Sequence, residues 1–191
     1  MKLEFNVTKF FILVSLLVSL GLPEIVSYLQ GNLVYCPKIL EFNKPLGLIV
    51  PYLNNPTFVN FIFSMYIFNY NSSKLEQHYG PKKYLFVLLL SFLLTSLMGL
   101  IVGLTFKNLF EYANFYNSLW IGITPITLCL RSLYYNKIDT DVMLFGHQVH
   151  SRNVIWIELL LLNLFGDPYH KFGIQLGGVL AGHILYNIFN F

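Results

Sequence analysis

The sequence predicts an all-α polytopic membrane protein that folds as a compact bundle of six transmembrane helices. Hydrophobic residues make up 55% of the chain and charged residues only 11%, with a mean hydropathy of +0.60. This composition lies well away from the soluble average. At about 20 residues per crossing plus loops, the 191 residues suffice for six short helices in one domain, residues 1–191, with no room for a second soluble domain.

The apolar residues fall into six segments, expected over residues 10–29, 57–70, 84–104, 116–130, 154–165 and 174–189. The first is expected to be an uncleaved helix, and a cleaved signal peptide is the alternative because Gly21-Leu22-Pro23 ends a short apolar core. The second is aromatic and shorter than a full span, so it needs burial among its neighbours or a thin bilayer. Between the segments we expect an interfacial loop over 30–56, a polar connection over 71–83, an amphipathic linker to residue 115 and a charged loop over 131–152.

Basic residues flank these segments rather than cluster on a soluble face, so the net charge of +3 does not predict a nucleic-acid partner. Six crossings put two groups of basic residues on opposite sides: Lys2, Lys9, Lys74, Lys82, Lys83, Arg131, Lys137 and Arg152 against Lys38, Lys44, Lys107 and Lys171. The positive-inside rule then places both termini in the cytosol. The glycosylation sequons at Asn6 and Asn71 fall on that side and are expected to carry no glycan.

The two cysteines add neither a disulfide framework nor a metal site. Cys36 falls in a loop and Cys129 in an apolar segment, and the spacing matches no metal motif. No cofactor is expected.

A run of small residues marks the last apolar segment. Gly177, Gly178 and Gly182 are spaced so that two membrane helices can approach backbone to backbone. Close van der Waals contact must hold helices together in lipid, because lipid supplies no hydrophobic drive for their association. We expect these glycines to form a helix-packing face. The run also resembles the last core helix of rhomboid intramembrane proteases, in which a catalytic histidine precedes a Gly-Gly pair. Gln175 stands at that histidine position.

The resemblance to rhomboids extends to two earlier segments. Glu76 and Gly80, followed by a basic pair, match the scaffold turn that leads into the third rhomboid helix. Counting back from this turn, the positions of the rhomboid histidine and asparagine hold Asn60 and Ser64. Ser118 stands where rhomboids carry the nucleophile in a Gly-x-Ser-Gly turn, but both glycines are replaced.

These departures imply a pseudoprotease rather than an enzyme. A serine nucleophile needs a base within hydrogen-bond reach and a formed oxyanion hole, and the amide of Gln175 accepts no proton at neutral pH. His183 follows eight residues later, about 12 Å along a helix, so it cannot replace that base without a register shift. Ser118, Gln175, Asn60 and Ser64 are therefore expected to be vestigial positions.

Two non-proteolytic branches of the rhomboid-like superfamily remain open. The stretch from Gly178 to Ile184 resembles the last helix of derlins, whereas the Glu76 turn and residues 139–155 resemble the ubiquitin-associated-domain-containing rhomboid-like proteins. Either resemblance implies protein quality control at the endoplasmic reticulum, in which membrane or lumenal clients pass to ubiquitin-ligase and ATPase machinery. The alternatives are an active rhomboid serine protease, a structural subunit of a membrane complex and a small transporter.

Glu158 and His183 are the candidate polar residues inside the spans. An ionisable side chain within a span is costly, so it marks a candidate site that faces the bundle or a water-filled groove. The other interpretation is that Glu158 reaches toward Arg152, which precedes it on the cytosolic side. Asn163, one turn further on, is expected to form a hydrogen bond to another helix.

Overall fold

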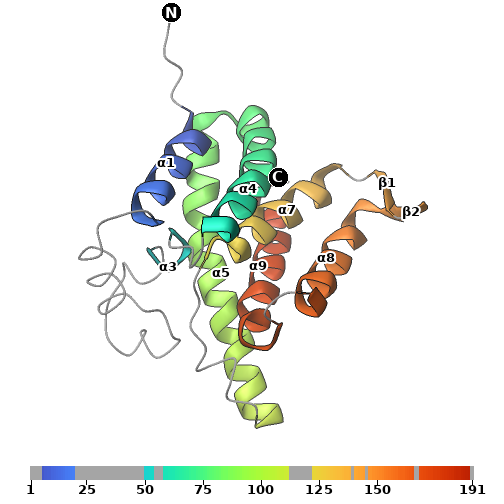
Figure 1. The fold of residues 1–191 in the computed structure, drawn as a ribbon. Helices are drawn as coiled ribbons and strands as arrows, with labels where there is room; N and C mark the ends of the chain where they lie inside the picture. Colours follow the sequence, from blue (N-terminus) through green and yellow to red (C-terminus); the bar gives the residue numbers. More distant parts are fainter. Residues whose placement is uncertain are drawn as a thin grey trace, which may run out of the picture.

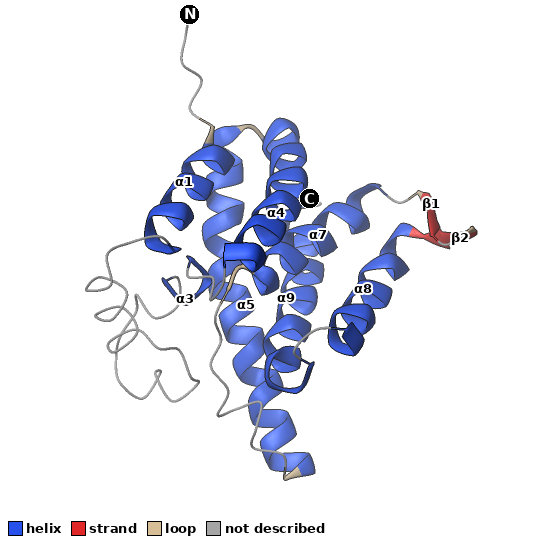
Figure 2. Cartoon of the chain, in the orientation of Figure 1, coloured by secondary structure: helices blue, strands red, loops and turns tan. Residues whose placement is uncertain are grey.

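The computed structural model describes residues 6–19, 50–53, 58–111, 122–138, 140–144, 146–165 and 168–189. This part of the chain is mostly helical, with one small hairpin (Figure 1, Figure 2). Its helices are α1 (Val7–Ser19), α3 (Val50–Leu53), α4 (Phe58–Tyr79), α5 (Pro81–Phe110), α7 (Thr124–Ile138), α8 (Ser151–Phe165) and α9 (Pro168–Phe189). Strands β1 (Asp141–Leu144) and β2 (His147–His150) pair antiparallel between α7 and α8.

The helices pack around α9. This helix contacts α5, α7 and α8, while α4 contacts α1, α5 and α7. Figure 1 shows α1 and α8 at opposite edges of the bundle. An aromatic cluster joins α1, α3, α4 and α5, in which the ring of Phe11 lies 5.0 Å from that of Phe68 and 5.5 Å from that of Phe92. Tyr52 on α3 packs on Phe92 at 5.6 Å, so burial of aromatic rings fixes this side of the bundle.

Helix α5 is apolar on its outer face and carries polar residues among the buried residues of its inner face. An exposed stripe repeats every four residues through Leu85, Leu89, Leu93, Leu97 and Ile101, while Ser91, Thr95 and Ser96 are buried. A soluble helix shows the reverse arrangement. By length and composition, two described helical segments are suited to crossing a membrane: Pro81–Phe110 and Phe172–Phe189. The described chain is therefore a helical bundle with membrane character, and the number of crossings stays a prediction.

Several expected boundaries are wrong. The expected polar connection over 71–83 is mostly helical, because α4 continues to Tyr79 with Asn71, Ser72 and Glu76 buried. The third segment also runs further, to Phe110. The first error has a clear cause: the polar residues of α4 face inward, so they do not mark a loop.

The expected charged loop over 131–152 is also wrong. Helix α7 continues to Ile138, the β1–β2 hairpin follows, and α8 begins at Ser151. Asp141 pairs with His150 and Leu144 with His147 in the hairpin, whose turn contains Gly146 at φ +84°. Most of the interfacial loop over 30–56, the end of the first segment and residues 116–121 of the fourth lie outside the described residues.

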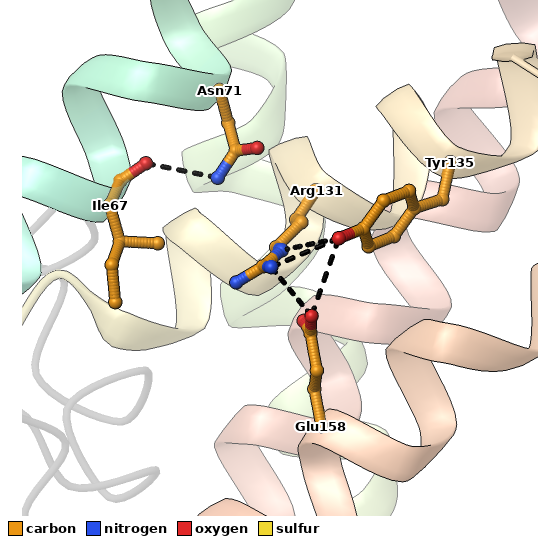
Figure 3. A network of polar contacts seen from close by, with 5 residues as sticks. All are labelled: Ile67, Asn71, Arg131, Tyr135 and Glu158. Atoms are coloured by element: carbon orange, nitrogen blue, oxygen red, sulfur yellow. Dashed lines mark hydrogen bonds and ion pairs between the residues drawn. The ribbon is translucent and has the colours of Figure 1, made fainter. Parts of the chain in front are cut away.

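The sequon at Asn71 lies in the middle of α4. Its side chain is buried, and Nδ2 donates a hydrogen bond to the carbonyl oxygen of Ile67 at 2.9 Å (Figure 3). A buried amide that is already bonded within a helix is a poor glycan acceptor on either side of a membrane. This sequon therefore does not report on the orientation of the chain.

Candidate functional site

Gln175, at the position of the rhomboid base, joins α9 to α8. Its side chain is buried, and its Oε1 accepts a hydrogen bond from Nδ2 of Asn163 at 3.1 Å. Asn163 thus bonds across helices as expected, and the same Nδ2 donates to the carbonyl oxygen of Leu159 at 2.6 Å. Two amides meet where the resemblance places a general base, and neither takes up a proton at neutral pH.

The other rhomboid-like positions are not gathered around Gln175 by any contact of the described residues. Asn60 and Ser64 lie on α4, and the side chain of Ser64 is half-buried. The side chain of Asn60 and the whole of Ser118 lie outside the described residues. The structure therefore describes the base position, Gln175, but not the nucleophile position, Ser118.

Two of the α9 glycines lie where this helix meets α5 and α7. A Cβ on Gly177 would come 2.5 Å from the backbone nitrogen of Gly99 on α5. A Cβ on Gly178 would overlap the carbonyl oxygen of Pro125 on α7. Backbone atoms cannot move aside as the end of a flexible side chain can, so both positions require glycine.

Gly182 contacts α7 one turn further along α9. A Cβ there would overlap the carbonyl oxygen of Cys129 and come 2.5 Å from Cβ of Ser132. The hydroxyl of Ser132 donates to the carbonyl oxygen of Val179 at 3.1 Å, which ties the two backbones together. The glycine face is thus used within the chain rather than left for another subunit.

Glu76 and Gly80 form a structural turn at one end of the bundle. The buried carboxylate of Glu76 accepts hydrogen bonds from the backbone nitrogens of Val7 at 2.7 Å and Thr8 at 3.0 Å, and from Oγ1 of Thr8 at 2.7 Å. It therefore caps α1, and its negative charge stabilises the positive end of that helix dipole. Gly80, at φ +76°, precedes α5, with Pro81 in the first helical position.

Glu158 forms an ion pair with Arg131 of α7, not with Arg152 as the sequence suggested. Nη2 of Arg131 lies 2.6 Å from Oε1 of Glu158, and the two side chains are 26% and 17% exposed. The hydroxyl of Tyr135 accepts from Nη2 of Arg131 at 2.9 Å and donates to Oε1 of Glu158 at 3.4 Å. Figure 3 shows Tyr135 completing this triangle between α7 and α8. Arg131 is the partner because α7 continues past it instead of ending there.

His183 is held by one residue from α7 and one from α8. Nδ2 of Asn136 on α7 lies 2.9 Å from Nδ1 of His183, and the ring stacks on Trp156 of α8 at 5.8 Å and 19°. The same Nδ2 donates to the carbonyl oxygen of Ser132 at 2.7 Å, which identifies it as the donor. Nδ1 of His183 is therefore the acceptor, and the neutral ring carries its proton on Nε2.

These contacts form three groups of polar side chains between the same helices, and we call them together the α7–α8–α9 network: Arg131, Tyr135 and Glu158; Asn136 and His183; Asn163 and Gln175. Three of its buried atoms find no hydrogen-bond partner within the described part of the chain, namely Oε2 of Glu158, Oδ1 of Asn163 and Nε2 of His183. An unsatisfied buried polar atom costs about 1–3 kcal/mol. The network thus contains two acceptors and one donor that are buried and that the described residues leave unsatisfied.

Sequence reasoning found Glu158, Asn163, Gln175 and His183 but missed the α7 members of the network. One signal was available, because Arg131 and Tyr135 are four residues apart and so share a helix face. This spacing is a weak signal, because a charged residue near the end of an apolar segment is also typical of a loop.

Fold and site together define a helical bundle of membrane character in which polar side chains join α7, α8 and α9 beside an apolar cluster. In comparisons with known proteins, no family model matches the chain. The chain is similar to the protein named "Rhomboid-like protein 14, mitochondrial" from Arabidopsis thaliana, with 22% identity over 134 residues, or 70% of the chain. The match spans 39% of that protein's length. This similarity supports a relationship to the rhomboid-like superfamily.

Proposed function

We propose that the protein is a non-proteolytic rhomboid-like membrane protein that recognises other membrane polypeptides through the α7–α8–α9 network. The observation that carries the proposal is the Gln175–Asn163 pair, which stands at the base position with no group able to take a proton. Rhomboid scaffolds without that base retain the bundle but lack the means to activate a serine.

His183 does not supply the missing base in the observed arrangement. Its acceptor nitrogen, Nδ1, already receives a hydrogen bond from Asn136, and Nε2 of the neutral ring bears the proton. Withdrawing a proton from a serine through this ring requires breaking the bond to α7. The ring's contacts with Asn136 and Trp156 instead suit a residue that positions helices.

The free atoms of the network match the chemistry of a polypeptide backbone. Each residue of a client other than proline carries one N–H donor and one C=O acceptor. In lipid these groups lack water, so a client segment that leaves its helix needs such partners. Glu158 and Asn163 hold such acceptors and His183 holds such a donor, all three buried, so a client segment reaches them only where α7, α8 and α9 separate.

Location and partners form the second half of the proposal. We place the protein in the endoplasmic reticulum, passing clients to ubiquitin-ligase and ATPase machinery, with both termini in the cytosol. Lys9, Lys82, Lys83, Lys137 and Arg152 lie in the first turns of α1, α5 and α8 and the last turn of α7, at one end of the bundle. This distribution supports that orientation. The name of the Arabidopsis protein includes the word mitochondrial, so the mitochondrion is the alternative location that an experiment must distinguish from the endoplasmic reticulum.

Site-specific cross-linking tests the recognition surface. We place a photo-reactive amino acid at Leu162, which is 39% exposed and one turn after Glu158 on α8, and in the control at Leu93 in the α5 stripe. Leu162 is expected to yield adducts with membrane polypeptides, and mass spectrometry of the tagged protein should recover ubiquitin-ligase and ATPase components with them. Equal adducts at both positions, or none at Leu162, would contradict the proposal. Recovery of mitochondrial proteins alone would contradict the location.

A further inference from the structure

A pocket of about 780 Å³ lies where α1, α4 and α5 meet. Its polar lining includes Asn6, Lys9, Ser73, Gln77 and Lys82, and its apolar lining includes Leu85. The pocket is at the end of the bundle that carries most of the basic residues, beside the turn from α4 to α5. It is separate from the α7–α8–α9 network.

The charges of the pocket favour an anion. Neither Lys9 nor Lys82 forms an ion pair with a carboxylate in the part of the chain that the structure describes. Glu76 also lines the pocket, but its carboxylate already accepts three hydrogen bonds from the start of α1. Two lysines therefore face the pocket against one carboxylate, whose hydrogen bonds are directed at the start of α1.

The apolar wall of the pocket continues into the lipid-facing stripe of α5. Leu85 lines the pocket and is 42% exposed, and Leu89 and Leu93 follow on the same helix face at 51% and 50% exposure. A ligand with a charged head and long apolar chains can therefore place its head in the pocket and its chains along α5.

We propose that this pocket binds the headgroup of an anionic phospholipid from the surrounding bilayer. The lysines hold the phosphate, the side chains of Asn6, Ser73 and Gln77 offer hydrogen bonds to the rest of the head, and the acyl chains lie on the Leu85 stripe. Juxtamembrane lysines attract anionic lipid at the cytoplasmic leaflet. A soluble phosphate compound would gain nothing from the apolar wall.

The test compares two neighbouring lysines of α5. Lys82 lines the pocket, whereas Lys83 is exposed outside it and carries the same charge. Binding of phosphatidylserine to the purified full chain is measured by native mass spectrometry, with phosphatidylcholine and glycerol phosphate as reference ligands. We expect Lys82→Gln to weaken phosphatidylserine binding roughly fivefold, and Lys9→Gln with Lys82→Gln roughly 25-fold. Lys83→Gln should change it less than twofold.

Each other outcome overturns the lipid site. Equal weakening by Lys82→Gln and Lys83→Gln would mean diffuse attraction to the surface. Equal binding of phosphatidylserine and phosphatidylcholine would remove the role of charge. Binding of glycerol phosphate as tight as that of phosphatidylserine would identify a soluble anion site. Unchanged thermal unfolding of the variants in phosphatidylcholine shows that they are folded.

Discussion

Gly182→Leu is expected to destabilise the bundle by about 3 kcal/mol or more, the upper end of the overpacking range. Even the first atom of a new side chain would overlap the carbonyl oxygen of Cys129 and crowd Ser132. Relief requires α9 to separate from α7, which also breaks the bond from Ser132 to Val179. Thermal unfolding in detergent measures the effect.

Two further variants make this result specific. Gly178→Ala adds only one methyl group, but that group points at the carbonyl oxygen of Pro125, so a clear loss of stability is expected. The side chain of Ile188 on α9 is 48% exposed, so Ile188→Leu should leave the unfolding temperature unchanged. If Gly182→Leu and Ile188→Leu unfold at the same temperature, the glycine face is not a helix contact.

Arg131→Leu is expected to cost about 3 kcal/mol, because it strands the carboxylate of Glu158 without its cation. This is the lower end of the range for a broken buried pair, since both side chains are partly exposed. Replacing both partners, Arg131→Met with Glu158→Leu, should restore most of the stability, because no unpaired charge remains.

The control for the ion pair is Arg152, which the sequence suggested as the partner of Glu158. Arg152→Gln should change the stability far less than Arg131→Leu, because the carboxylate of Glu158 is paired with Arg131. A larger loss on Arg152→Gln, or a double variant whose losses simply add, would contradict the observed pairing. The double-mutant cycle measures this coupling directly.

The helical bundle with membrane character was predictable because it rests on composition and on long apolar segments. The helix boundaries were less predictable, and Glu76 shows why. A carboxylate followed by a glycine and a basic pair is typical of a connecting loop, yet Glu76 is buried within α4 and caps α1 from 69 residues away in the sequence. Only the fold reveals that the polar group has a partner.

The α8 and α9 residues of the candidate site were predictable from the sequence, but their partners on α7 were not. Glu158 and His183 stood out because polar groups in apolar segments are costly. Their partners, Arg131 and Asn136, belong to the last turns of α7, which the sequence suggested was a loop. Contacts between α7, α8 and α9 depend on how the helices cross, and local patterns do not carry that information.

The lack of proteolysis is the central claim, and a serine-directed fluorophosphonate probe tests it most directly. Loss of the base and of the oxyanion donors costs about a hundredfold or more each, so no labelling that depends on Ser118 is expected. The native chain and Ser118→Ala should behave alike with the probe, with a model transmembrane substrate and in cells. Labelling that disappears in Ser118→Ala, together with cleavage of the substrate by the native chain alone, would contradict the account.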